Sequence, residues 1–394
     1  MSKYVVPQLA EGVYAVGSRD HDRRMFDALI PLPHGTTYNS YVVKGKKTAL
    51  IDTVNPGFEK ELLGKLDQLV EIADLDYIVM NHAEPDHAGS IPAVMAAAKR
   101  AILVASEKGA DMARIYYGVP EERMRRVKEG DTIDLGGKTL RFIDAPFLHW
   151  PETMFTYLVE DGMLFSCDFF GAHTAYGICD EDVDDLLGLA RSYFGEIMMP
   201  FRTPGKKALE KLAPLDIKVI APSHGPVYKN PQKILGAYRE WTAGATAEKA
   251  IIAYVSMWGS TAAMVRTMAE ELVNAGIDVK LHNLALVDLG ALAADLVDSR
   301  AVVLGTPTVL GGMHPLALYA VNLVKALRPP LKYGAVLSSY GWNGGALKSA
   351  AELLGPTGMQ VAGAVEIRGP PTEKDHIAVA ELARKLAGMI RGNA

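Results

Sequence analysis

The last part of the chain, from Lys249 onward, alternates regularly between strand-like and helix-like segments. Short runs rich in β-branched residues predict strands, and amphipathic runs predict the helices between them. Five strands that alternate with five helices are typical of a parallel, doubly wound α/β sheet, because parallel strands need a crossover connection. We predict the strands at Lys249–Ser256, Asp278–Leu281, Ala301–Gly305, Tyr333–Ser339 and Gln360–Ile367. We predict the helices at Thr261–Ala275, Gly290–Val297, Pro315–Leu327, Gly345–Leu354 and Glu373–Arg391.

Residues 1–245 follow a different pattern, with many short strands interrupted by helices and by glycine or proline turns. A helix followed by small residues at 231–248 separates the two patterns, so we place domains at 1–245 and 249–394. Two domains suit a chain of 394 residues. The predicted strands of the first domain are Lys47–Asp52, Asp76–Met80, Ala101–Ala105, Leu140–Ile143, Phe155–Val159, Met163–Ser166 and Ile217–Ala221, and its predicted helices are Pro56–Val70, Ile91–Arg100 and Val183–Phe194.

The composition argues against several classes of protein. A net charge of -5 and a pI near 6.1 lack the basic balance that is typical of nucleic-acid-binding proteins. The two cysteines, Cys167 and Cys179, are too few for a disulfide framework, which favours a reducing compartment. The N-terminus lacks the pattern of a signal peptide, and no run of 18 apolar residues occurs. We therefore expect a cytoplasmic protein that binds neither nucleic acid nor membrane.

A dense group of metal-ligand side chains follows the predicted strand Asp76–Met80. Four of them lie within Asn81–His87, and three others each come shortly after a further predicted strand, where functional sites usually gather. The seven are His82, Glu84, Asp86, His87, His149, Asp168 and His224. A single histidine is more often structural, but this many ligand types at strand ends indicates a site for two metals. Without a thiolate, iron, manganese and zinc stay open, and mixed histidine and carboxylate ligands suit non-haem iron.

Three loops of the second domain have the composition of a mononucleotide site. The first follows Lys249–Ser256 and begins a helix, where hydroxyls and backbone N–H groups form an anion site. It contains neither a P-loop nor a GxGxxG pattern, which disfavours a dinucleotide. In the later loops, glycines let the backbone approach a planar ring and Trp342 offers a stacking face; glycine-rich turns without a ligand are the alternative. The candidates are Ser256, Met257, Trp258, Gly259, Ser260, Thr261, Pro307, Thr308, Val309, Leu310, Gly311, Ser339, Tyr340, Gly341, Trp342, Asn343 and Gly344.

The pattern HxExDH, followed downstream by His, Asp and His, resembles the metallo-β-lactamase fold in its flavo-diiron variant. Hydrolases of that superfamily usually carry HxHxDH. Here Glu84 takes the place of the middle histidine, which favours iron over zinc on grounds of ligand hardness. The stretches GTTYNSYVV, HAEPDHAGS, LHWPETMFTY and APSHGP extend the resemblance. The three loops of the second domain resemble those that hold FMN in short-chain flavodoxins.

This resemblance implies a fold and a set of residue roles. The first domain would be a metallo-β-lactamase-like αββα sandwich, and the second a flavodoxin-like five-stranded sheet that binds FMN. The iron nearer the flavin would be bound by His82, Glu84 and His149, the other iron by Asp86, His87 and His224, and both by a bridging Asp168. His173 and Tyr193 match a pocket-lining pair that would hydrogen-bond the substrate or deliver protons, with packing and capping as the alternative.

The family resemblance also implies an activity and partners. The protein would reduce dioxygen to water, nitric oxide to nitrous oxide, or both, with electrons that pass through FMN to two irons. No CxxC…CxxC rubredoxin module is present in the sequence, so the electrons would come from a separate donor, a rubredoxin or in some archaeal relatives reduced F420. A head-to-tail homodimer, or a dimer of such dimers, would bring the FMN of one chain to the diiron site of the other.

Two other classes of function stay open at this point. A hydrolase of the metallo-β-lactamase fold with a flavodoxin-like docking module would contain zinc and no flavin, and its metals would activate water. An electron carrier with a vestigial metal site would contain FMN and no iron. A hydrolase has no evident use for a fused flavodoxin module, and an intact set of seven ligands argues against a vestigial site. Metal and flavin content therefore separates the three hypotheses.

Overall fold

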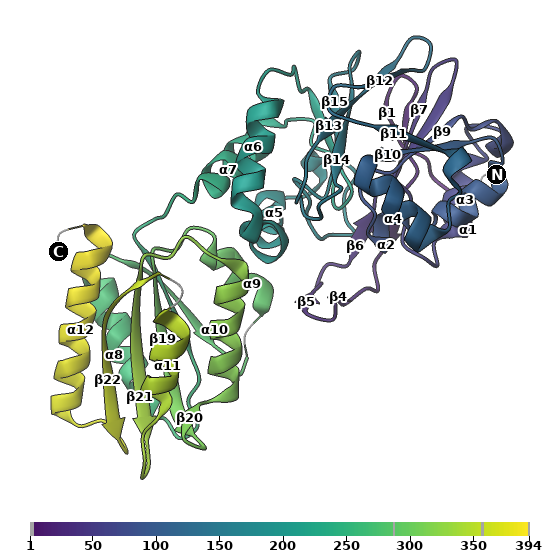
Figure 1. Ribbon diagram of the computed structural model, residues 1–394. Coiled ribbons are helices and arrows are strands. Elements are labelled where there is room, and N and C mark those ends of the chain that lie inside the picture. Colours follow the sequence, from purple (N-terminus) through teal and green to yellow (C-terminus); the bar gives the residue numbers. More distant parts are fainter. Residues whose placement is uncertain (1–3, 287, 356–357, 393–394) are drawn as a thin grey trace. The chain divides into compact units, whose positions relative to one another are not determined.

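The computed structural model describes residues 4–286, 288–355 and 358–392 (Figure 1). The chain divides into two compact units. The first comprises the residues up to Phe194 together with Phe201–Thr242, and the second comprises Gly195–Pro200 and the residues from Ala243 onward. None of the helices in the described part of the chain has the length and apolar character that a bilayer-spanning helix requires.

Two β-sheets pack face to face in the first unit. One has the strand order β1-β2-β7-β8-β9-β10-β11 and the other the order β12-β13-β14-β15-β16. The first sheet comprises β1 (Gln8–Ala10), β2 (Val13–Ala15), β7 (Tyr41–Lys44), β8 (Thr48–Ile51), β9 (Tyr77–Val79), β10 (Ile102–Ser106) and β11 (Met124–Val127). The second comprises β12 (Thr132–Asp134), β13 (Thr139–Asp144), β14 (Met154–Leu158), β15 (Met163–Cys167) and β16 (Val219–Pro222). Two small ribbons add β3 (Ser18–Asp20) with β6 (Thr36–Tyr38), and β4 (Met25–Phe26) with β5 (Ile30–Pro31).

Alternation along the strands explains the layered packing of this unit. Val43 and Ile51 of the first sheet and Phe142 and Phe165 of the second belong to one buried cluster between the sheets. Their neighbours in sequence, such as Leu50, point the other way into a cluster with α1, α3 and α4. The helices of the unit are α1 (Glu59–Leu66), α2 (Pro85–Ala88), α3 (Ile91–Ala97), α4 (Glu107–Tyr117), α5 (Leu186–Tyr193), α6 (Arg202–Leu212) and α7 (Gln232–Ala243). The predicted αββα sandwich is confirmed.

All seven strands predicted in the first domain are present, as β8, β9, β10 and β13–β16. The N-terminal strands, β11, β12 and the helices α2, α4 and α6 were not predicted, and α1 is shorter than expected. Strands of three residues carry too little alternation to be recognised from sequence. We expected an irregular backbone throughout Asn81–His87, but Pro85–Ala88 forms one helical turn. Pro85 occupies its first position, where proline is favoured because no N–H is needed.

The second unit is a doubly wound sheet with the order β18-β17-β19-β21-β22, and all neighbouring strands on this path are parallel. Its strands are β17 (Lys249–Tyr254), β18 (Asp278–Asn283), β19 (Ala301–Val309), β20 (Gly312–Met313), β21 (Tyr333–Tyr340) and β22 (Gln360–Arg368). Its helices are α8 (Ser260–Asn274), α9 (Leu289–Leu296), α10 (Pro315–Leu327), α11 (Ala346–Leu354) and α12 (Glu373–Arg391). The predicted fold class and every predicted element of this part are confirmed.

Helices cover both faces of this parallel sheet (Figure 1). Met268 of α8 and Leu386 of α12 share one buried cluster with sheet residues such as Ile252. On the other face, α9, α10 and α11 contribute Leu292, Val321 and Leu354 around the sheet. This two-sided burial explains why the strands read as nearly continuous apolar runs. It also leaves the carboxyl ends of the strands as the place for a ligand.

Candidate metal centre and flavin loops

The ligand-rich segment Asn81–His87 follows β9 and is held by a buried aspartate. The Asp52 carboxylate accepts hydrogen bonds of 2.7 Å from the backbone N–H of Asn81 and 2.9 Å from its side-chain amide. The Asn81 amide oxygen in turn accepts from the Thr156 hydroxyl of β14, at 2.7 Å. Burial raises the pKa of Asp52 to about 6. These hydrogen bonds fix Asn81 between the two sheets. The ligand residues of the segment begin at the next position, His82.

Asp168 lies at the centre of the candidate site and faces two pairs of histidines. It follows β15 directly, at the carboxyl end of that strand. Its Oδ2 lies 3.4 Å from His82 Nε2 and 3.5 Å from His149 Nε2. Its Oδ1 lies 2.9 Å from His87 Nε2 and 3.5 Å from His224 Nε2. One carboxylate therefore turns each of its oxygens to a different pair of imidazoles.

Two further carboxylates complete the pairs. Glu84 Oε2 lies 3.2 Å from His82 Nε2 and 3.0 Å from His149 Nε2. The other pair belongs to Asp86, whose Oδ1 lies 3.3 Å from His87 Nε2 and whose Oδ2 lies 3.0 Å from His224 Nε2. Two groups of ligand atoms result, each within 4.8 Å. The first group contains His82, Glu84, His149 and Asp168, and the second contains Asp86, His87 and His224.

The unpaired polar atoms of the cluster fit a pair of metal ions. Among the described residues, both carboxylate oxygens of Asp86 and Asp168 and both ring nitrogens of His87 are buried without a hydrogen-bond partner. Buried polar atoms without partners are rare in folded proteins, because each costs about 1–3 kcal/mol of desolvation. Metal coordination requires acceptor atoms that converge at short distances, and such atoms need no hydrogen-bond geometry toward one another. Histidine nitrogens with carboxylate oxygens suit iron, manganese or zinc.

Two of the histidines are oriented through their second ring nitrogen. His82 Nδ1 lies 2.7 Å from Glu152 Oε1, which also accepts from the backbone N–H of Ala83 at 2.9 Å. His224 Nδ1 donates to the carbonyl oxygen of Thr37 at 2.6 Å. Such contacts fix the tautomer and direct Nε2 toward a metal. Glu152 and Thr37 lie in the stretches LHWPETMFTY and GTTYNSYVV, but neither was predicted to orient a metal ligand, because those stretches do not show which histidine they contact.

The charges of the cluster are strongly coupled. Burial opposes ionisation of Asp168, but the neighbouring His87 and His82 outweigh it and hold the pKa of Asp168 well below its usual range. Burial likewise lowers the pKa of His87, but Asp168 and Asp86 outweigh it and raise that pKa to about 9. The Asp168 carboxylate is therefore ionised at neutral pH and requires positive charge nearby.

Cys167, which we did not count as a ligand, also comes close to the cluster. Its Sγ lies within 4.8 Å of ligand atoms of His87 and Asp168. Burial, together with the charges of Asp168 and Asp52, raises the pKa of the Cys167 thiol well above its usual value. Burial thus favours the neutral thiol, and the histidine and carboxylate set stays our prediction for the metal ligands.

His173 and Tyr193 lie beside the second group of ligands. The His173 ring centroid is 4.8 Å from that of Tyr193 and 5.0 Å from that of His224. His173 Nδ1 lies 3.0 Å from the Thr36 hydroxyl, while its buried Nε2 has no hydrogen-bond partner in the described part of the chain. Burial and the neighbouring His224 keep the pKa of His173 well below its usual value. Burial and the charge of Asp168 raise the pKa of Tyr193 well above its usual value. Both side chains are therefore neutral at neutral pH.

The first candidate flavin loop joins β17 to α8 and forms an anion-binding turn. The Ser256 hydroxyl accepts from the backbone N–H groups of Gly259 and Ala262, at 3.2 Å each. Gly259 adopts a positive φ of 93°, which favours glycine, directly before the helix begins at Ser260. The start of this helix is where the sequence predicts a phosphate site, and that assignment stays a prediction.

The structure brings all three loops together at the carboxyl ends of β17, β19 and β21. The Thr261 hydroxyl lies 2.9 Å from that of Ser339, and the backbone N–H of Ala346 donates to the Thr308 hydroxyl at 3.3 Å. A Cβ on Gly345 would lie 2.2 Å from the carbonyl oxygen of Gly311, so only glycine allows this crossing. Pro307, Thr308 and Val309 lie in β19, which continues four residues beyond its predicted end at Gly305.

These loops carry large apolar side chains that are exposed. Trp258, Leu310 and Trp342 are 92%, 103% and 83% exposed. Large apolar side chains are rarely this exposed without a ligand or partner to cover them, so the three loops have the surface expected around a planar ring. The predicted flavin residues lie in these loops and in the adjoining ends of β19, β21 and α8, at one edge of the sheet.

Comparisons with known proteins agree with this architecture. Residues 36–225 match the ODP family beta lactamase model, and residues 252–381 match the flavodoxin model. The chain is 37% identical to a nitric oxide reductase of Moorella thermoacetica, over 97% of this chain and 98% of that protein. It is 35% identical to a coenzyme F420H(2) oxidase of Methanothermobacter marburgensis, over 99% of this chain and 100% of that protein.

A solved structure also matches the whole chain. It is the rubredoxin oxygen:oxidoreductase of Desulfovibrio gigas, with a TM-score of 0.95 and 29% identity over 99% of each chain. A two-metal centre of histidines and carboxylates, fused to a flavodoxin domain, defines an oxidoreductase that combines a flavin with a metal pair. The chain belongs to the flavodiiron protein family, whose cofactors are FMN and a diiron centre.

Proposed function

We propose that this flavodiiron protein reduces dioxygen to water, nitric oxide to nitrous oxide, or both. Relatives that match over nearly their whole length are named for these substrates, one as a nitric oxide reductase and one as a rubredoxin oxygen:oxidoreductase. FMN and a diiron centre supply the electron storage and the reduction chemistry when they are bound. The protein holds the two groups in place and controls the supply of protons and the access of the substrate.

The observation that carries the proposal is the carboxylate of Asp168 between two pairs of histidines. We assign Asp168 as the bridge between two irons. One iron would be held by His82, Glu84 and His149, and the other by Asp86, His87 and His224. Besides Asp168, each pair of histidines faces a single carboxylate, Glu84 through one oxygen and Asp86 through both. Three protein ligands and a shared bridge leave positions for a small substrate.

His173 and Tyr193 are assigned as the residues that bind the substrate or supply its protons. The neutral His173 presents a buried Nε2 without a protein partner, and the protonated Tyr193 keeps a hydroxyl donor beside His224. Hydrogen-bond donors of this kind stabilise charge that develops on a reduced diatomic molecule. Gly171 favours this arrangement, since a Cβ there would lie 2.9 Å from Tyr193 Cζ.

The flavin assignment rests on the three loops of the second unit. We assign the phosphate of FMN to the turn Ser256–Thr261 and the flavin ring to the loops after β19 and β21, beside Trp342. We keep 1–245 and 249–394 as the proposed domain limits. An external electron donor, either a rubredoxin or reduced F420, and a head-to-tail homodimer or dimer of dimers complete the proposal.

Metal and flavin content on protein purified without oxygen tests this function first. We expect about two irons and one FMN per chain, and consumption of dioxygen or nitric oxide when reduced rubredoxin or reduced F420 is supplied. Zinc without flavin would contradict the proposal and favour a hydrolase. FMN without iron would leave only an electron carrier.

A further inference from the structure

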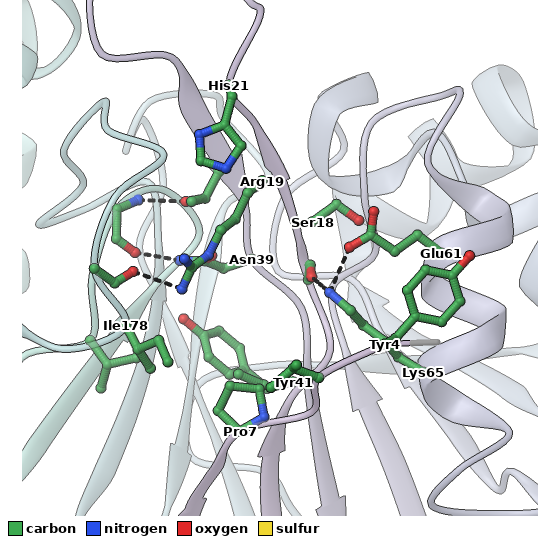
Figure 2. Close-up of a pocket in the computed structure, with 17 residues that line it drawn as sticks. Tyr4, Pro7, Ser18, Arg19, His21, Asn39, Tyr41, Glu61, Lys65 and Ile178 are labelled. Atoms are coloured by element: carbon green, nitrogen blue, oxygen red, sulfur yellow. Dashed lines mark hydrogen bonds and ion pairs between the residues drawn. The ribbon is translucent and has the colours of Figure 1, made fainter. Parts of the chain in front are cut away.

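A cavity of about 500 Å³ opens in the first unit (Figure 2). Its volume lies in the range of small-molecule sites. It lies between the N-terminal segment, the strand β3, the helix α1 and the segment that contains Gly177 and Ile178. None of the seven ligand residues lines it.

One wall of the cavity holds the loop that carries His224. Asn39 donates from its side-chain amide to the carbonyl oxygens of Pro222 at 2.8 Å and Gly225 at 2.7 Å. The Tyr41 hydroxyl donates to the same Pro222 oxygen at 2.7 Å. Asn39, Tyr41 and Gly225 all line the cavity. A ligand there would therefore contact the residues that position one of the candidate metal ligands.

The cavity carries one positive charge without a carboxylate partner. The Arg19 guanidinium donates to the carbonyl oxygen of Gly177 at 3.0 Å and forms no ion pair within the residues that the structure describes. Lys65 also lines the cavity, but its ammonium group is paired with Glu61 at 2.7 Å and contacts the carbonyl oxygen of Gly17. The charge that remains available at this site is that of Arg19.

A buried hydroxyl in the same cavity lacks a partner. Ser18 is 1% exposed, and its Oγ has no hydrogen-bond partner among the described residues. An unpaired hydroxyl at this depth costs free energy unless a ligand or water satisfies it. Ser18 and Arg19 are neighbours on β3, so their side chains point to opposite sides of the strand, and only that of Arg19 is exposed toward a ligand in the cavity (Figure 2).

The remaining walls are apolar and aromatic. The ring of Tyr4 packs over Gly64 of α1, where a Cβ would lie 2.5 Å from the ring. Pro7 and the ring of Tyr41 lie below Arg19 in Figure 2, and Ile178 faces them from the other side. Flat apolar surfaces beside one exposed guanidinium are the features of a site for a planar organic anion.

We propose that this cavity binds a small aromatic carboxylate. Its carboxylate pairs with the Arg19 guanidinium, which matches that group in a two-point arrangement. Its ring packs against Pro7 and Ile178, on the side of the cavity that holds Arg19. The bound ligand contacts Asn39, whose two hydrogen bonds hold the loop that carries His224. The assignment of this site does not rest on the proposed reaction.

Titration calorimetry of the holoenzyme with benzoate tests the site, with benzyl alcohol as the neutral probe and inorganic phosphate as the anion without a ring. We expect benzoate to bind and the other two probes to bind at least about tenfold more weakly, because a charged hydrogen bond is worth about 1.5–3 kcal/mol. Absence of benzoate binding overturns the proposal. Equal binding of phosphate overturns the aromatic class, and equal binding of benzyl alcohol overturns the role of charge.

Two variants locate the binding. Arg19 is exposed, so Arg19→Gln leaves the core intact and is expected to weaken benzoate binding about tenfold. Arg114→Gln, which removes an exposed arginine of α4 outside the cavity, is the matched control and is expected to leave the affinity unchanged. Equal effects of the two substitutions would mean that benzoate responds only to the net charge, and the cavity would then not be its site.

Discussion

At the scale of single residues, the metal centre depends on side chains that touch no metal. Glu152 is 3% exposed and connects His82 to the backbone of Ala83. Burial opposes its ionisation, but the hydrogen bond to His82 outweighs it and lowers the pKa of Glu152. The ionised carboxylate thus fixes one tautomer of His82 and keeps its Nε2 aimed at Asp168. Glu152 is therefore a positioning residue.

Replacement of this carboxylate is expected to weaken the metal site without unfolding the protein. Glu152→Gln keeps an oxygen that can accept from Ala83 but removes the charge that orients His82. Outer contacts of this kind change metal affinity by about 10- to 100-fold. Competition with a chelator for iron measures the affinity directly, independently of turnover. Glu122→Gln, at an exposed position of the same unit, is the control. Equal iron affinity in the two variants would show that Glu152 does not orient the ligand.

The limits of sequence analysis are clearest for these same residues. The ligands themselves were predictable, because Asp168 and His224 directly follow strands whose apolar runs are easy to recognise. Glu152 and Thr37 were not, because they reach His82 and His224 over separations of 70 and 187 residues along the chain. Only the folded chain brings each residue to its histidine, and the stretches that contain them do not show that contact.

At the scale of elements, local pattern predicted the parallel sheet far better than the sandwich. The bounds of α10 and α12 agree with the prediction to the residue, because each has a long apolar stripe and clear ends. The strands β1 and β2 have only three residues each, and their pairing is set by contacts with β7 rather than by their own pattern. The single turn α2 likewise has too few residues to show a helical period.

The segment Gly195–Pro200 supplies a buried acid that opposes stability at high pH. Glu196 packs against Gly290 near the start of α9. A Cβ added to Gly290 would lie 2.7 Å from Glu196 Oε1. Burial, followed by the charge of Asp288, raises the pKa of Glu196 from 4.5 to about 8. The folded state therefore binds this proton more tightly than the unfolded state. The resulting stability is fully present below pH 4.5 and is lost as the pH rises toward about 8.

Removal of this proton-binding group is expected to flatten the pH dependence. Glu196→Gln stays neutral at every pH, so at about pH 8 it is expected to be more stable than the original chain by roughly 3 kcal/mol. Near pH 5, where Glu196 is protonated in the fold, the difference shrinks. Thermal unfolding midpoints at both pH values measure this, with the exposed Glu352→Gln as the control. A parallel shift of the midpoint at both pH values would assign the effect to packing rather than to the proton.

At the scale of the whole molecule, the proposed reaction needs electrons to pass from the second unit to the first, either within one chain or between two chains. The flavin loops lie on the second unit and the ligand cluster on the first. In a head-to-tail homodimer each FMN serves the metal centre of the partner, and the two-fold axis produces two such pairs. In a chain that works alone, FMN serves the metal centre of its own chain. The two arrangements differ in what a mixed dimer can do.

A mixed dimer of two inactive variants separates these arrangements. Asp168→Asn removes the proposed bridge and with it the metal centre of one chain. Ser260→Asp places a negative charge at the start of α8, where it repels the FMN phosphate yet favours the helix itself. In the mixed dimer, the chain with Asp168→Asn keeps its FMN and the chain with Ser260→Asp keeps its metals. A head-to-tail pairing therefore restores one working FMN–metal pair of the two.

We expect each variant alone to be inactive, and dimers formed by co-expression and purified with two different tags to recover about half of the original turnover per dimer. Ser260→Asn, which has nearly the same size without the charge, is expected to keep FMN and activity, and thereby shows that charge rather than shape removes the flavin. Iron and FMN are counted in each preparation, so that loss of a cofactor is distinguished from loss of pairing. Mixed dimers that contain one FMN and one metal pair but show no turnover would place both groups of a working pair in one chain and contradict the head-to-tail arrangement.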